Sequence, residues 1–186
     1  MFLLIQASLN CLKSCLVESM TILIGQSSSS MPLKPQLSVQ KNQREYYSGK
    51  KKQHTLKAQV IVHWKTGLIL DIQTSKGSVH DFKLYKDTCP DWLPCDTKLL
   101  ADSGYQGIAK LHEQSFTPFK KPRGGQLLAL CKQANHYLAK FRIMVEHKIG
   151  LIKLFKIVAH KYRNRRQRYD LRMKLFASVV NLELGL

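Results

Sequence analysis

The order in which apolar patterns follow one another constrains the fold of this chain most. Two runs rich in β-branched residues lie within residues 54–74, on either side of Lys65-Thr66-Gly67, and predict a β-hairpin. A further short strand fits residues 97–102. Apolar residues then recur every three or four positions and predict helices over 134–158 and 169–184. Strands followed by helices, without an internal repeat, predict an α+β or α/β domain with a mixed sheet.

Charge is the second constraint. The 186 residues are enough for one domain, and a hydrophobic fraction of 44% argues against a disordered chain. Lysine and arginine total 30 against 12 acidic residues, which gives a formal net charge of +18. Such an excess repels itself unless a polyanion is bound, so nucleic acid is the first partner to expect and an anionic membrane the second.

The N-terminal stretch differs in amino-acid composition from the rest of the chain. Residues 1–24 are apolar, whereas residues 25–45 are polar, with prolines and a serine run, and read as a loop or linker. The apolar part has no basic start and is interrupted by Lys13 and Glu18, which predicts neither a secretory signal nor a membrane span. Five cysteines at no zinc or disulfide spacing predict reduced thiols and a cytoplasmic protein.

Two acidic residues lie at positions where a catalytic or metal-binding carboxylate is expected, namely a strand end and a helix face. Asp102, in LADSGYQG, closes a predicted strand, where it either caps the following turn or faces a cleft as a catalytic carboxylate. Glu146 interrupts an apolar helical run and either lies on the polar face or points into a site. Arg142, Glu146 and Lys153 are four and seven positions apart and fall within roughly 60° on one helix face. The trio is either an i,i+4 ion pair with a solvated neighbour or a metal ligand beside two phosphate-binding cations.

Basic runs adjoin tyrosines in two places. Lys50, Lys51 and Lys52 follow one tyrosine pair, and the second run contains Lys161, Arg163, Arg165, Arg166 and Arg168. A charge run is usually a solvated face, but the net charge favours phosphate binding here. Such contacts position DNA without reading its sequence, and no base-reading module is visible.

Four separated segments, at residues 44–59, 77–86, 98–112 and 141–158, together with the tail 161–172, resemble the catalytic half of bacterial insertion-sequence transposases of the DDE type, similar to the IS5 group. The resemblance covers about residues 40–186 and is specific because the motifs occur in the family's order.

This resemblance implies a ribonuclease-H-like mixed sheet flanked by helices, in which three acids bind two Mg²⁺ or Mn²⁺ ions. Asp102 matches the second acid and Glu146 the third, as metal ligands. Lys153 would hold a DNA phosphate and Arg142 would orient the site. It also implies double-stranded DNA as partner, at transposon ends and target, and a homodimer or larger assembly, without a membrane or a small-molecule substrate. A bacterial, nucleoid-associated location in the cytoplasm is implied in the same way. Asp81 and His80 lie in a shared segment, either as a structural acid and its neighbour or as supports of the metal ligands.

The chain departs from the family at the first acid. Relatives carry it on an early strand, whereas this chain has only Glu18 and Glu45 before Asp71. Gly25 or one of Ser27 to Ser30 takes its place, and Asp71, in a hairpin arm, is a poor substitute. We therefore expect residues 1–40 to be irregular or decayed and residues 41–186 to form the catalytic domain. Metal-dependent strand cleavage and transfer would be impaired in this copy, and the alternative is a non-catalytic basic nucleic-acid binder or inactive transposase remnant.

Overall fold

The computed structural model describes residues 21–30, 46–48, 52–88, 93–159 and 168–183. The strands are β1 (Thr21–Ser30), β2 (Tyr47–Ser48), β3 (Gln53–His63), β4 (Ile69–Lys76), β5 (Lys98–Ala101) and β6 (Ser115–Phe116). The α-helices are α2 (Asp81–Asp87), α3 (Ala129–Leu154), α4 (Lys156–Ala159) and α5 (Tyr169–Glu183), and the short 3-10 turns η2 (Ser103–Tyr105) and η3 (Ile108–Lys110) follow β5. The predicted mixed α/β architecture is confirmed.

The strands form one sheet in the order β2-β3-β1-β5-β6, and β4 also pairs with β3. β3 runs antiparallel to β1, β2 and β4, whereas β5 runs parallel to both β1 and β6. The predicted hairpin is β3–β4, and Gly67 in its turn has a φ of 69°, a left-handed conformation that favours glycine.

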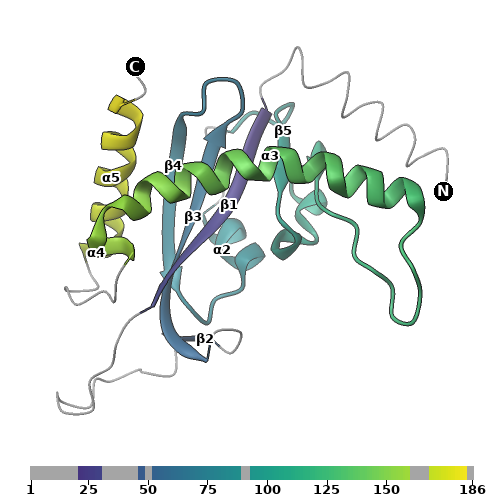
Figure 1. The fold of residues 1–186 in the computed structure, drawn as a ribbon, viewed down its shortest axis with the longest axis horizontal. Helices are drawn as coiled ribbons and strands as arrows, with labels where there is room; N and C mark the ends of the chain where they lie inside the picture. Colours follow the sequence, from purple (N-terminus) through teal and green to yellow (C-terminus); the bar gives the residue numbers. More distant parts are fainter. Residues whose placement is uncertain (1–20, 31–45, 49–51, 89–92, 160–167, 184–186) are drawn as a thin grey trace.

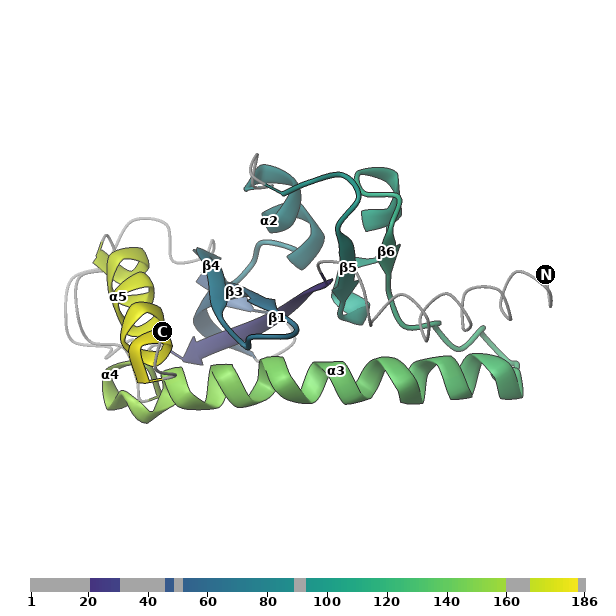
Figure 2. The same ribbon diagram turned by 90° about the horizontal axis from the view of Figure 1, so that it is seen from above.

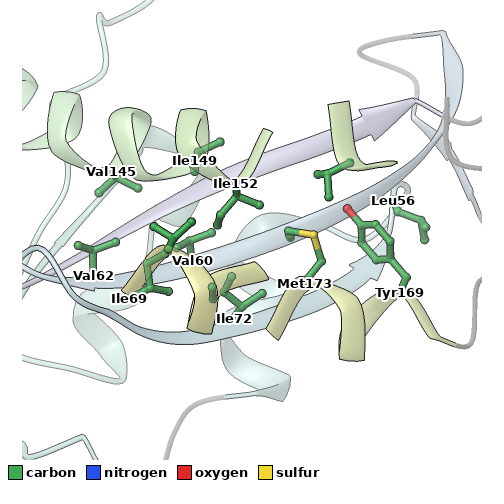
Figure 3. Close-up of a cluster of buried hydrophobic side chains, with 14 of the residues drawn as sticks. Leu56, Val60, Val62, Ile69, Ile72, Val145, Ile149, Ile152, Tyr169 and Met173 are labelled. Atoms are coloured by element: carbon green, nitrogen blue, oxygen red, sulfur yellow. The ribbon is translucent and has the colours of Figure 1, made fainter. Parts of the chain in front are cut away.

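Helices cover both faces of the sheet. Figure 2 shows α3 along one face and α2 on the other. On the α3 side, apolar residues of β3 and β4 pack against buried residues of α3 and α5, and Figure 3 shows side chains such as Val60, Ile72, Ile152 and Met173 gathered there. The smaller core on the α2 side includes Ile24, Ile61, Tyr85 and Leu99. β1 and β5 therefore lie between α3 on one face of the sheet and α2 on the other.

The predicted helices are confirmed with one difference. The expected helix over residues 134–158 begins earlier, at Ala129, and ends at Leu154; α4 then starts at Lys156. Phe155 separates the two because its backbone is extended, with φ −69° and ψ 103°. The predicted helix over 169–184 is α5. No helix in the described part of the chain is long and apolar enough to cross a membrane.

β1 differs from what the sequence predicts. Residues 25–45 read as a loop and residues 1–40 as an irregular segment, yet residues 21–30 form a strand at the centre of the sheet (Figure 1). Nine of its residues pair with β3 and four with β5. Backbone pairing with β3 outweighs the low strand propensity of Gly25 and the serines. The rest of residues 1–40 lies outside the described residues.

Candidate active site

Asp102 follows β5 directly, on the α3 side of the sheet. Leu99 and Ala101 belong to the core on the α2 side and Leu100 to the core on the α3 side, so alternation turns Asp102 toward α3. Its Oδ1 accepts a hydrogen bond from the backbone N–H of Ser103 at 2.6 Å and caps η2. The two interpretations of Asp102 are therefore compatible, because it caps the turn and faces the helix.

Arg142 joins the two acids. Its Nη1 donates to Asp102 Oδ1 at 3.3 Å, and its Nε donates to Glu146 Oε1 at 2.9 Å, one helical turn along α3. Since a guanidinium spans under about 3 Å between its nitrogens, the two carboxylate oxygens lie within about 9 Å of each other. The structure thus brings together Asp102, Arg142 and Glu146 from positions 40 to 44 residues apart in sequence.

The electrostatics of this trio favour a permanently charged arginine. The hydrogen bond to Glu146 and the charge of Asp102 raise the pKa of Arg142, while partial burial opposes the rise. The side chains remain 37% to 57% exposed, so solvent screens both ion pairs and each contributes little to stability. The cluster is therefore held loosely enough for its carboxylates to take other partners.

A cavity of about 220 Å³ opens beside these residues. Asp102 and Arg142 contribute polar walls, and Leu138, Phe141 and Val145 of α3 contribute apolar ones. Pro118 and Asn135 also line it. Asp102 therefore stands at a hollow and not on a flat surface, whereas Glu146 does not line this cavity.

The sheet register identifies the strand position next to Asp102. Ile24 pairs with Ala101, so Gly25 stands beside Asp102, one strand spacing or about 4.8 Å away. Ile24 belongs to the core on the α2 side, and Gly25 pairs with Val60, whose side chain belongs to the core on the α3 side. Position 25 therefore shares the face of Asp102. Of the candidates Gly25 and Ser27 to Ser30, the register selects Gly25.

Asp71 does not supply the missing carboxylate. It lies on β4, which is separated from β5 by both β3 and β1. Its neighbour Ile72 packs in the core on the α3 side, so Asp71 faces away from α3, where it accepts hydrogen bonds from Gln73 Nε2 at 3.1 and 3.2 Å.

The described residues do not fit the two-ion site that the resemblance implies. No group of three or more His, Cys, Asp or Glu side chains able to hold a metal occurs among them. Asp102 and Glu146 are two carboxylates of the kind that Mg²⁺ prefers, but glycine at position 25 leaves the set one ligand short. The guanidinium of Arg142 forms an ion pair with both carboxylates.

Asp81 and His80 lie at the start of α2, on the other side of the sheet. Asp81 pairs with Lys57 at 3.0 Å, and His80 Nδ1 accepts the backbone N–H of Phe82 at 3.3 Å as a helix cap. In the described part of the chain, no hydrogen bond or ion pair joins either residue to Asp102 or Glu146. Asp81 Oδ2 does pack against Gly104, two residues after Asp102: a Cβ added at Gly104 would lie 2.4 Å from that oxygen. Its contact is with the turn that carries Asp102.

The predicted DNA-binding cations are only partly described. Lys153 is exposed near the end of α3, seven residues after Glu146 and on the same face. Lys52 is exposed in the turn before β3, and Arg168 is exposed just before α5. The others lie outside the described residues: Lys50, Lys51, Lys161, Arg163, Arg165 and Arg166.

Sequence reasoning missed the residues that fix the loop beside the cavity. Asn135 exchanges two hydrogen bonds with the backbone of Phe119, and Gln106 donates to the carbonyl of Pro118. The signal available was the stretch TPFKKPRGG at residues 117–125, which combines turn residues with three cations.

Comparison with known proteins identifies the family. A family model described as DDE superfamily endonuclease matches residues 30–181. A probable transposase for insertion sequence element IS702 from Microchaete diplosiphon is 43% identical over 146 residues, which cover 78% of this chain and 52% of that protein. The chain thus spans about half the length of this relative, and no solved structure matches it. Gly25 precedes the matched range, and its place beside Asp102 comes from the sheet register. The chain belongs to the DDE superfamily endonucleases, among the DDE-type transposases of insertion sequences.

Proposed function

We propose that residues 21–183 form the ribonuclease-H-like catalytic domain of an insertion-sequence transposase that acts on double-stranded DNA, and that Gly25 impairs cleavage in this copy. The observation that carries the proposal is the shared guanidinium of Arg142, which holds Asp102 and Glu146 within about 9 Å of each other. A mixed sheet with an acid at the end of a parallel strand and a long helix across its face supports the fold assignment.

Asp102 and Glu146 are the two retained ligand positions for a divalent ion in this proposal. Their backbones suit them to that task, because Asp102 follows β5 directly and Glu146 lies within a 26-residue helix, while their side chains are free to change partners. Position 25 is the third. The loss of one shared ligand lowers cleavage and strand transfer by orders of magnitude. The single positive charge of Arg142 offsets part of the charge of these two carboxylates.

Binding of DNA does not require the missing acid. Phosphate contacts depend on the cations, and Lys153 stands two turns of α3 beyond Glu146, about 10 Å along the helix axis. We infer that the chain retains DNA binding at the α3 face, as part of a dimer or larger assembly. The second candidate function follows from the same observation. In this second candidate the chain is a basic DNA binder without cleavage activity, and Arg142 with the two acids is only a surface ion-pair cluster.

Plasmid nicking distinguishes the two candidates. Supercoiled DNA is incubated with Mn²⁺ or Mg²⁺ and with the unchanged chain, Gly25→Asp or Gly25→Asn. We expect little nicking by the unchanged chain and by Gly25→Asn, and at least 100-fold more by Gly25→Asp, because only the carboxylate completes the ligand set. Adding Asp102→Asn or Glu146→Gln to Gly25→Asp should return nicking to background.

Two results decide against the nuclease proposal. If Gly25→Asp nicks no faster than Gly25→Asn while still binding the plasmid, the non-catalytic binder is the better description. If nicking persists in the Asp102→Asn and Glu146→Gln backgrounds, the activity belongs to other residues or to a contaminant.

A further inference from the structure

A cationic loop, defined as residues 117–125, runs between β6 and α3 beside the candidate active site. Lys120, Lys121 and Arg123 of this loop are exposed. Gly125 N–H donates to the carbonyl of Pro122 at 3.3 Å, and Gly124 has a φ of 74°, so a tight turn presents Arg123 at its tip. Within the described ranges, none of the three cations forms an ion pair.

Three hydrogen bonds from side chains outside the loop hold the backbone of Pro118 and Phe119, near the start of the loop. Asn135 on α3 accepts the backbone N–H of Phe119 at 2.8 Å and donates to its carbonyl at 3.0 Å. Gln106, in the turn after Asp102, donates to the carbonyl of Pro118 at 3.0 Å. The loop is therefore attached to both elements that carry the acids. Lys120 follows Phe119 directly, which places its Cα within 4 Å of the anchored residue.

The anchor lies on the polar stripe of α3. Asn135, Arg142, Glu146 and Lys153 are spaced 7, 4 and 7 residues apart, which keeps them within about 40° of one another around the helix. Asn135 stands about 10 Å before Arg142, and Lys153 stands about 27 Å beyond Asn135. The cationic loop and Lys153 thus flank the acids from opposite ends. At about 3.4 Å per base pair, the distance between them corresponds to roughly eight base pairs of duplex.

We propose that Lys120, Lys121 and Arg123 bind backbone phosphates of double-stranded DNA on the side of the acids opposite Lys153, and that Asn135 is the positioning residue of this surface. The inference rests on the proposed function. Unpaired cations gain most from releasing phosphate counterions, and a loop that is already ordered loses little entropy on binding. These contacts fix the position of the duplex and do not read its sequence.

The test measures affinity against salt. The full chain is titrated into a fluorescently labelled 30-base-pair duplex of mixed sequence, and anisotropy gives Kd between 50 and 300 mM NaCl. The variant Lys120→Gln/Lys121→Gln is compared with Lys83→Gln/Lys86→Gln. The latter removes the same charge from exposed positions of α2, on the far face of the sheet (Figure 2).

We expect the loop variant to bind at least tenfold more weakly at 100 mM salt, with a slope of log Kd against log salt that is smaller by about two. The α2 variant should change Kd less than threefold. Asn135→Ala should weaken binding severalfold with the slope unchanged, because it frees the loop and keeps its charges.

Two results separate failure of this inference from failure of the proposed function. If the unchanged chain binds the duplex and the two double variants weaken it equally, net charge alone accounts for binding and the loop has no special role. If the unchanged chain does not bind the duplex, the proposed function itself fails and this inference falls with it.

Discussion

Introducing a carboxylate at position 25 tests the site through folding stability, independently of activity. Position 25 lies about 4.8 Å from Asp102 on the same face of the sheet. Two carboxylates about 5 Å apart repel by about 0.8 kcal/mol in water and about 3 kcal/mol at an effective dielectric of 20. Asp102 is 37% exposed, which puts the cost of Gly25→Asp relative to Gly25→Asn between these limits, at about 1–2 kcal/mol in EDTA.

A divalent ion should reverse this penalty. If the completed set binds Mn²⁺ with a Kd on the order of 0.1 mM, typical of weak carboxylate sites, 10 mM Mn²⁺ stabilises the variant by about 2.7 kcal/mol. For a chain of 186 residues this corresponds to a rise in Tm of about 5–11 °C. The unchanged chain and Gly25→Asn should rise by less than about 2 °C.

The assay is thermal unfolding followed by circular dichroism, in EDTA and in 10 mM MnCl₂. Ser27→Asp is the matched control, since it adds the same charge on the same strand two residues further along, about 7 Å from position 25. Mn²⁺ should raise the Tm of Ser27→Asp by less than it raises the Tm of Gly25→Asp. An equal rise in Tm for Gly25→Asp, Ser27→Asp and Gly25→Asn would refute the assignment of position 25 and of Asp102 as its partner.

Three further predictions concern stability and are measured by urea unfolding, the first two with a paired variant. Gly104→Ala should lower the free energy of unfolding by about 1–3 kcal/mol, because its Cβ would lie 2.4 Å from a carboxylate oxygen of α2. Gly150→Ala, whose Cβ would have nothing within 4 Å, should raise it by about 0.5–1 kcal/mol. Equal effects of the two substitutions would contradict the tight packing behind the turn. Met173→Ala, at a fully buried position, should lower the free energy of unfolding by about 2–5 kcal/mol. Leu171→Ala, at a site 67% exposed, should change it by no more than about 0.5 kcal/mol. The reverse order would mean that α5 packs by another face. Arg142→Gln should lose less than about 1 kcal/mol, because both its ion pairs are solvent-screened, and a loss above 3 kcal/mol would show that they are not.

Elements with a strong apolar period were predictable from sequence. The buried face of α3 includes Phe141, Val145, Ile149 and Ile152, spaced three or four residues apart, and this spacing is sufficient to predict a helix. The same spacing placed Arg142 and Glu146 on one face. That Arg142 also reaches Asp102 was not predictable, because the contact depends on how α3 crosses the end of β5.

The second half of β1 was not predictable, because its residues carry no strand pattern. The run from Gly25 to Ser30 is polar and small, and its extended conformation comes from pairing with β3, while Thr21 to Ile24 also pair with β5. The register of those strands is tertiary information, and it separates Gly25 from the serines as the position beside Asp102. The anchors of the cationic loop were hidden for a similar reason, since Asn135 bonds to backbone 16 residues away.

A crystal of the Gly25→Asp variant soaked in MnCl₂ tests the central claim most directly, through the anomalous signal of manganese. We predict one or two Mn²⁺ peaks with carboxylate oxygens of Asp102, Glu146 and position 25 about 2.0–2.3 Å away, and with Arg142 turned from both acids. Asp102 and Glu146 oxygens more than 10 Å apart, or a metal bound elsewhere while Arg142 still bridges them, would contradict the account.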